Sequence, residues 1–499
     1  MWRYVVILVL TGLLVISAGG NVLLLRQTQQ LQTDSDRLRQ RAVAAESAQG
    51  KLQAQIDQLN KTQQAAASQP TSAPQTAAAP PTNPTQPTNP TQPTANAQPT
   101  APLPSITGNT GGADPSVLRQ IEYEVAGLRG LQPRSDVPLK FLSQDALQRY
   151  FVNNFNQDYL PIERETDQKL LQTLGLLNQG DNVVQTLLDV LQEQVIGMYN
   201  ADEKTLYLVG EQSQFGANEK STFAHEYALA LQDQYFGLRT LMPKHPDNDD
   251  RGLAVDALSE GDAELIQRLW GQQSLTPDEL NQLNQGNQGQ NSSLDSAPLY
   301  MREQLLFPYT DGFNFVRQAY QNGGGYTAVD DLFLHPPDST AQILHPDKYK
   351  NHVQPVDVTL PDVSPTLGSG WRTINSNVLG ELDTRLMLQQ LTDQTRAVRG
   401  SSGWAGDRWE LLEKDGRQAL VIKSVWDSDT SARAFFDTFG LAMQNRFAGA
   451  RQEEMSATRQ ALTATSGATD VRRDGSNVLT VISFDRASAD AVVRAVGAP

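Results

Sequence analysis

Hydrophobic residues at the start of the chain form one uninterrupted run. The segment from Tyr4 to Leu25 contains no charged side chain, and as a helix it is long enough to cross the roughly 30 Å hydrocarbon layer of a membrane. We predict a transmembrane anchor over this segment, 4–25, after a short tail at 1–3. A cleavable signal peptide ending near Ser17-Ala18 is the alternative reading, although the apolar run continues past that point.

The next two segments are polar and carry different patterns. Between 27 and 66 a seven-residue spacing links Leu31, Leu38, Ala45, Leu52 and Leu59. Because the matching heptad positions are half polar, we predict a weak coiled-coil stalk, with a solvated and partly helical stalk as the alternative. Segment 67–112 is rich in Pro, Thr and Gln. Such a composition cannot bury a core, so we predict a disordered, extended linker there.

Globular patterning begins at about 113 and continues to about 365. Apolar residues recur there with a helical period, which predicts helices at 114–129, 143–157, 163–178, 181–194, 218–235, 253–270, 298–306 and 312–321. A short strand is expected at 205–209 and a polar loop at 281–296. We therefore predict a mainly α domain over 113–365.

The region 368–499 alternates helical and strand patterns. A helix is expected at 374–392, followed by two alternating strands joined by Asp415-Gly416, which is a strong hairpin signal. A helix near 428–447, a second hairpin at Asp474-Gly475 and a short last helix complete the pattern. The tryptophans Trp404, Trp409 and Trp426 are expected in its core. We predict a small α+β domain here, and the fold class of the whole chain is α+β.

Composition excludes several functions. The net charge is -16 and the sequence pI is about 4.8, which argues against nucleic-acid binding because phosphate neutralisation needs a basic surface. The chain has no cysteine, so thiolate catalysis, disulfides and cysteine metal sites are excluded.

The segment with potential chemistry is His225-Glu226-Tyr227-Ala228-Leu229. Residues four apart lie on nearly the same face of a helix, and zinc peptidases use this spacing to present two histidines, with the intervening glutamate as general base. The second histidine position holds Leu229, which has no lone pair. About 35 residues later, Glu260 stands in a second helix, at a separation suited to a third ligand.

Several ordered segments resemble those of bacterial, gluzincin-type zinc-metallopeptidase-like proteins. The family pattern reads HExxHALQDQ, EG[DE]A and STEQILHP, and this chain has HEYALALQDQ, EGDA and STAQILHP, with Gly197-Met198-Tyr199, Pro308-Tyr309 and Gly312 also in place. The likeness covers about 190 to 490.

The resemblance implies a zincin-like fold for 113–365, with His225 as first zinc ligand, Glu226 as general base and Glu260 as third ligand. Two positions depart from it, because Leu229 replaces the second histidine and Ala341 replaces the glutamate of STEQ. Losing a group that only supports a metal ligand costs about 10- to 100-fold in affinity or activity, so losing a ligand should cost more. We therefore interpret Glu226, His225 and Glu260 as vestigial.

Other side chains could in principle fill the vacancy. Gln232 and Asp233 lie one to two turns further along the helix, and Tyr227 points to another face. Asp256, Asp262 and His345 are conceivable replacements, but each is more simply explained as a surface or capping residue. His245, His335 and His352 lie in turn-like sequence and are expected to be exposed.

The sequence thus predicts a single-pass cell-membrane protein with most of its length outside the cytoplasm, although Arg3 before the anchor and the arginines after it favour the opposite orientation on a simple count. We expect a non-catalytic metallopeptidase homologue that needs no cofactor, contacts the membrane through its N-terminal helix, and binds a polypeptide or a cell-envelope component but no nucleic acid. One alternative is an active zinc peptidase using His225, Glu260 and an unidentified ligand, with Glu226 as base. A structural envelope protein is the other.

Overall fold

The computed structural model describes residues 114–178, 180–194, 196–209, 215–243, 248–285, 292–497 and 499. The predicted tail, anchor, stalk and linker, at 1–3, 4–25, 27–66 and 67–112, lie outside this part of the chain, as does His245. None of the described helices combines the length and the apolar character that a membrane crossing requires.

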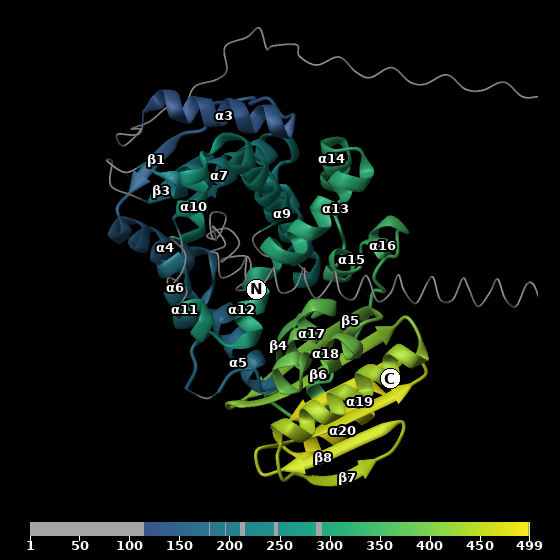
Figure 1. Cartoon of the computed structure of the whole chain (residues 1–499). Coiled ribbons are helices and arrows are strands. Elements are labelled where there is room, and N and C mark those ends of the chain that lie inside the picture. Colours follow the sequence, from purple (N-terminus) through teal and green to yellow (C-terminus); the bar gives the residue numbers. More distant parts are fainter. Residues whose placement is uncertain are drawn as a thin grey trace, which may run out of the picture. The chain divides into compact units, whose positions relative to one another are not determined.

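The described chain is an α+β structure in which a helical region precedes a seven-stranded antiparallel sheet (Figure 1). The helices of the first region are α3 (Pro115–Arg129), α4 (Gln144–Asp158), α5 (Pro161–Leu174), α6 (Val183–Gln194), α7 (Ala217–Phe236), α8 (Leu238–Leu241), α9 (Asp249–Ser274), α10 (Pro277–Gln285), α11 (Ser292–Ser296), α12 (Leu299–Phe307), the π-helix η1 (Pro308–Gly312), α13 (Phe313–Gly323), α14 (Tyr326–Leu334), α15 (Thr340–Leu344) and α16 (Pro346–Lys350).

A three-stranded sheet lies within the helical region. Its strands are β1 (Leu139–Leu142), β2 (Gly197–Asn200) and β3 (Thr205–Val209), in the order β1-β3-β2. β1 runs parallel to β3 and β2 runs antiparallel to it. The predicted strand at 205–209 is confirmed. Gly197 lets β2 approach α7 closely, because a Cβ at this position would lie 2.6 Å from Cγ2 of Thr222.

The second region begins after a 3₁₀ turn, η2 (Ser364–Leu367). Its elements are β4 (Arg372–Asn377), α17 (Gly380–Leu391), α18 (Gln394–Ser401), β5 (Trp404–Lys414), β6 (Arg417–Trp426), α19 (Asp429–Arg446), β7 (Arg451–Met455), β8 (Arg459–Ala464), β9 (Gly467–Asp474), β10 (Asn477–Ser483) and α20 (Arg486–Val496). The strand order is β4-β5-β6-β10-β9-β8-β7.

Both faces of the large sheet are buried. Side chains alternate across β6, so that Leu420 and Ile422 join the core that contains the residues of α19, whereas Ala419 and Val421 pack with those of α20. The first of these cores continues into the helical region. The predicted burial of Trp404, Trp409 and Trp426 is confirmed, as all three are at most 3% exposed.

The two predicted hairpins form, but their turns differ. Asp415 and Gly416 are the two turn residues between β5 and β6, both with positive φ, at 48° and 75°. In the second hairpin Asp474 still pairs with Asn477, so the turn residues are Gly475 and Ser476.

Two predicted elements need correction. The helix expected at 374–392 starts only at Gly380, because Arg372–Asn377 pairs with β5 as the edge strand β4. The expected loop at 281–296 contains the end of α10 and the short helix α11 within its described residues. In both cases the polar composition concealed the element, since neither segment buries a continuous apolar face.

Two glycines permit a close approach between α9 and η1. A Cβ on Gly261 would come within 2.5 Å of the backbone carbon and oxygen of Gly312, and a Cβ on Gly312 would lie 2.2 Å from the carbonyl oxygen of Ala257. Because the obstacle is backbone, no side-chain rotation can relieve either clash.

We therefore expect Gly261→Ala to lower the free energy of unfolding by about 1 to 3 kcal/mol, the usual range for overpacking. Gly127→Ala is the matched control, since Gly127 also lies within a helix but a Cβ there meets nothing within 4 Å. It should be neutral or stabilising because alanine is the better helix former. Urea unfolding of both variants measures the difference, and equal effects would contradict the packing argument.

Candidate functional site

Helix α7 carries the His225-Glu226 pair into the protein core. The helix begins after Gly216, whose N–H donates to the carboxylate of Glu219 at 2.8 Å, and ends at Gly237 with φ of 69°. Between these ends every residue from Ser221 to Asp233 is buried. A helix buried on all sides places its polar residues where each needs a protein partner.

Helix α9 packs against α7 and supplies the carboxylate that the resemblance assigns. The Nε2 atom of His225 lies 3.0 Å from Oε2 of Glu260. The structure thus brings these two predicted ligand residues together and places Glu226 next to them on α7. Leu229 is fully buried at the second histidine position.

The other ring nitrogen of His225 is held by Gln267, one more residue of α9. Its Oε1 lies 3.1 Å from Nδ1 of His225, while its Nε2 donates to Oγ of Ser221 at 2.9 Å. Since Oε1 can only accept, Nδ1 carries the hydrogen. The sequence reasoning missed Gln267, although its place two turns after Glu260 sets both residues on one face of α9.

The protonation of the His225–Glu260 pair follows from its burial. Burial lowers the pKa of His225 and raises the pKa of Glu260 well above its ordinary value. Both shifts favour the uncharged forms, in which the carboxylic acid of Glu260 donates to Nε2 of a neutral imidazole. The two residues therefore satisfy each other.

Tyr309 completes the cluster from the π-helix η1. Its side chain hydrogen-bonds to Glu260, and its ring centroid lies 6.4 Å from that of His225. Burial and then the charge of Glu260 raise the pKa of Tyr309 well above its ordinary value, so the hydroxyl remains a donor. π-Helical turns are frequent at functional sites, and this one aims a phenol at the predicted ligand pair.

Glu226 lies fully buried beside the same cluster. Burial first, and then the charge of Glu260, raise the pKa of Glu226 well above its ordinary value, while the backbone of Tyr199 acts in the opposite direction. Burial therefore favours the protonated form of this carboxyl. A general base must accept a proton, so a base role for Glu226 would need a nearby positive charge, such as a metal ion, that keeps the carboxylate ionised.

The conceivable replacement ligands are mostly committed elsewhere. Asp262 accepts from Nε of Arg129 at 2.8 Å and from Nε2 of Gln232 at 3.0 Å. His345 lies 2.6 Å from Oε1 of Glu381 in the second region. Asp256 is buried near Glu260. Burial is the main cause that raises the pKa of Asp256, and the charge of Glu260 is the second.

Polar residues near the end of α7 are engaged as well. Asp233 accepts from the hydroxyl of Tyr199 at 2.7 Å and from the backbone N–H of Leu238 at 3.0 Å. Gln232 exchanges hydrogen bonds with Ser259, accepting from its hydroxyl at 2.7 Å and donating to its carbonyl at 3.1 Å.

These residues do not fit the three-ligand zinc site that the resemblance implies. Within the described ranges, no group of three or more His, Cys, Asp or Glu side chains is arranged to hold a metal ion. A catalytic zinc site requires three protein ligands and an open position. Here one ligand position holds an alkyl side chain, and the imidazole and the carboxyl hydrogen-bond to each other.

Ala341 lies on α15, a short helix that contacts α9 away from Glu260. The neighbouring Thr340 donates its backbone N–H to Asp250 at 3.2 Å and its hydroxyl to the same carboxylate, while Leu382 N donates to the Thr340 hydroxyl at 3.1 Å. Asp250 precedes Glu260 by ten residues, which is about 15 Å along a helix. The STAQILHP segment thus joins the helical region to α17.

Exposed histidines were predicted in turn-like sequence. His335 and His352 are both exposed, which confirms the prediction for these two residues. His335 pairs with Asp331 on α14, at 3.1 Å.

The described part of the chain is thus an α+β protein whose two central helices enclose a polar cluster. A family model described as a domain of unknown function, DUF8575, matches residues 369–493, the region of the large sheet. No curated protein and no solved structure matches the chain. The family match leaves the helical region, and His225 with it, outside its range.

The pH dependence of stability can be tested at Glu122, which faces α7 from α3. Burial raises the pKa of Glu122 from 4.5 to about 7. The charge of Glu122 adds to the effect of burial in raising the pKa of Tyr227 on α7. Because the folded state holds the proton more tightly, the free energy of unfolding falls as the pH rises from about 4.5 to about 7.

Glu122→Gln should remove this part of the pH dependence. Above pH 7 it should be more stable than the unaltered protein by up to about 3 kcal/mol, the equivalent of the pKa shift. Urea unfolding at pH 5 and pH 8 measures the difference. Asp278→Asn, which neutralises an exposed carboxylate on α10, is the control, and an unchanged pH dependence in Glu122→Gln would refute the assignment.

Proposed function

We propose that this chain is a membrane-anchored, extracytoplasmic homologue of zinc metallopeptidases that binds a polypeptide or a cell-envelope component without cleaving it. The fully buried Leu229 at the second histidine position, beside His225 and Glu260, carries this proposal. A working site would present the side chains of His225 and Glu260 to zinc together with a third ligand. In this chain an alkyl side chain takes the place of that third ligand.

The contact between His225 and Gln267 supports descent from a metal site. A zinc-binding histidine usually donates its second ring N–H to a carbonyl or a carboxylate, which fixes the ring and its tautomer. Nδ1 of His225 makes such a contact with Oε1 of Gln267, at 3.1 Å. The ring is therefore still held with Nε2 toward Glu260, although the ligand at position 229 is gone.

The predicted anchor, stalk and linker are also part of the proposal. Their support is the sequence pattern, because they lie outside the described residues. An apolar helix at 4–25, a polar stalk and an extended spacer would hold the folded regions away from the membrane surface, where a binding protein could reach large partners.

Metal analysis of the purified full-length protein tests the proposal. After incubation with zinc and dialysis, we expect much less than one zinc ion per chain. Stoichiometric zinc that His225→Ala removes, or peptide cleavage that Glu226→Gln abolishes, would instead establish the alternative of an active zinc peptidase.

Restoring the missing ligand provides a gain-of-function test. Leu229→His should create a zinc site, because the ring of His225 is already oriented, and a second change of His225→Ala should abolish it. Leu231→His is the matched control, since Leu231 is equally buried on α7 but lies about 200° further around the helix. Thermal unfolding followed by circular dichroism shows whether each variant folds. Equal zinc binding by both leucine variants would contradict the assigned geometry.

A further inference from the structure

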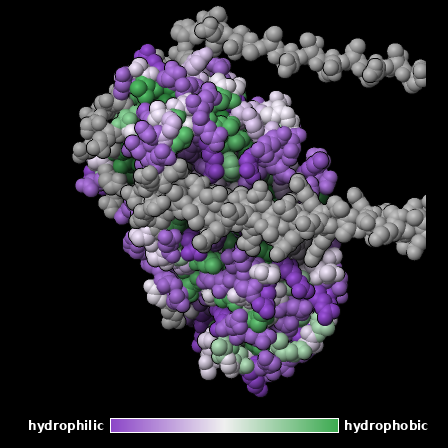
Figure 2. Space-filling model, in the orientation of Figure 1, coloured by the Kyte–Doolittle hydropathy of each residue, from purple (hydrophilic) through white to green (hydrophobic). Residues whose placement is uncertain are grey.

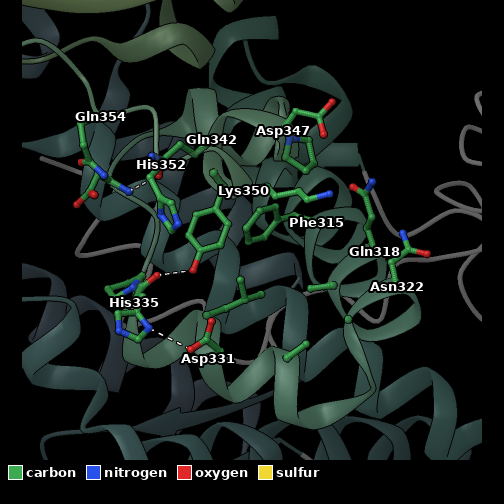
Figure 3. A pocket seen from close by; sticks show the side chains of 18 of the residues that line it. Phe315, Gln318, Asn322, Asp331, His335, Gln342, Asp347, Lys350, His352 and Gln354 are labelled. Carbon is green, nitrogen blue, oxygen red and sulfur yellow. Dashed lines mark hydrogen bonds and ion pairs between the residues drawn. The ribbon is translucent and has the colours of Figure 1, made fainter.

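The surface of the described chain offers a concave site away from His225. On the face shown in Figure 2, hydrophilic residues cover most of the described surface and hydrophobic ones form small separate patches. A cavity of about 860 Å³ opens among α13, α14, α16 and the segments beside them (Figure 3). This volume lies within the usual range for ligand sites. Neither His225 nor Glu260 lines it.

Several exposed polar side chains of the cavity have no partner among the residues that the structure describes. In the described part of the chain, no hydrogen bond or ion pair engages the side chains of six lining residues, Gln318, Asn322, Asp347, Lys350, His352 and Gln354. By contrast, the wall around them is braced. Arg251 pairs with Asp338 at 3.2 Å, and the Tyr349 hydroxyl donates to the carbonyl of His335 at 2.7 Å.

The chemistry of the free groups suits a peptide backbone. Each carboxamide of Gln318, Asn322 and Gln354 offers one acceptor oxygen and an N–H donor, the same pair that a peptide unit presents. Asp347 and Lys350 add one charge of each sign. Apolar residues add little open surface to the cavity, because its lining residues Phe315 and Leu332 are each only 4% exposed.

The aromatic residues argue against a saccharide. Sugar rings stack on exposed aromatic faces, but Phe315 is only 4% exposed. It packs perpendicular to the ring of Tyr349, with centroids 5.5 Å apart. The Phe315 ring is therefore closed to stacking, whereas the amide and charged groups are exposed.

We propose that the cavity between α13, α14 and α16 binds an extended segment of a polypeptide. This inference rests on the proposed binding function and assigns it a place and a partner class. The carboxamides of α13 pair with the backbone of the bound segment, and Lys350 and Asp347 meet its charged groups. The buried cluster of α7 and α9 takes no part in this contact.

Fluorescence anisotropy with the full-length protein tests this site. The probe is serum albumin that has been reduced, carboxymethylated and labelled with fluorescein, which makes it an unfolded polypeptide. We expect saturable binding. Gln318→Ala and Asn322→Ala should each weaken it about two- to tenfold, the range for one neutral hydrogen bond, and Gln318→Trp should abolish it by filling the cavity.

Variants of Gln321 are the matched control. Gln321 is exposed on the same helix, α13, but does not line the cavity, so Gln321→Ala and Gln321→Trp should bind the probe as the unaltered protein does. Equal losses in the Gln318 and Gln321 variants, or none in either, would overturn the site while leaving the proposed function standing.

Two further outcomes separate the proposals. If the unaltered protein binds chitotetraose but not the unfolded polypeptide, and Gln318→Trp abolishes that binding, the polypeptide assignment is overturned and the cavity is a saccharide site. Cleavage of the probe by a Glu226-dependent activity would overturn the non-catalytic function, whichever residues bind the probe.

Discussion

Each polar side chain that α7 and α9 bring into the core has to find a partner there. Two hydrogen-bonded chains meet this constraint for seven of these side chains, and Glu226 belongs to neither chain. One runs from Ser221 through Gln267, His225 and Glu260 to Tyr309, and the other links Ser259, Gln232, Asp262 and Arg129. Both cross from α7 to α9, and the second reaches α3 through an arginine whose side chain is fully buried. An unpaired buried charge is costly, so these networks fix how the central helices pack.

Much of this arrangement was accessible from the sequence, and the rest was hidden for physical reasons. Helices with one apolar face, such as α3 and α19, are predicted by the helical period of their apolar residues. The Asp415-Gly416 turn likewise predicts its hairpin. Helix α7 is buried on every side and was found through its motif as well as its period. β4, by contrast, is polar and partly exposed, so that its pairing with β5 creates the strand, and local propensity gave no sign of it.

The site shows the same division. Motif spacing indicated that His225 and Glu260 would meet, and resemblance supplied their roles. The contact of His225 with Gln267 and the donation from Tyr309 join residues far apart in sequence, and nothing local marks them. Likewise, the polar segment around Thr340 is held by Asp250 and Leu382, which are 90 and 42 residues away in the sequence. Long-range partners of buried polar groups are what a single sequence conceals.

The π-helix η1 has a consequence for how the chain can vary in length. It inserts a wider turn between α12 and α13, directly where Gly312 meets the backbone of Ala257. A π-turn holds one residue more than an α-turn, so losing one residue here would leave a regular α-helical turn with Phe315 and Val316 still facing the core. In the regular helices on either side, the same deletion would rotate everything after it by about 100°. Among these helices, the Pro308–Gly312 turn is therefore the place where the chain can be shortened by one residue.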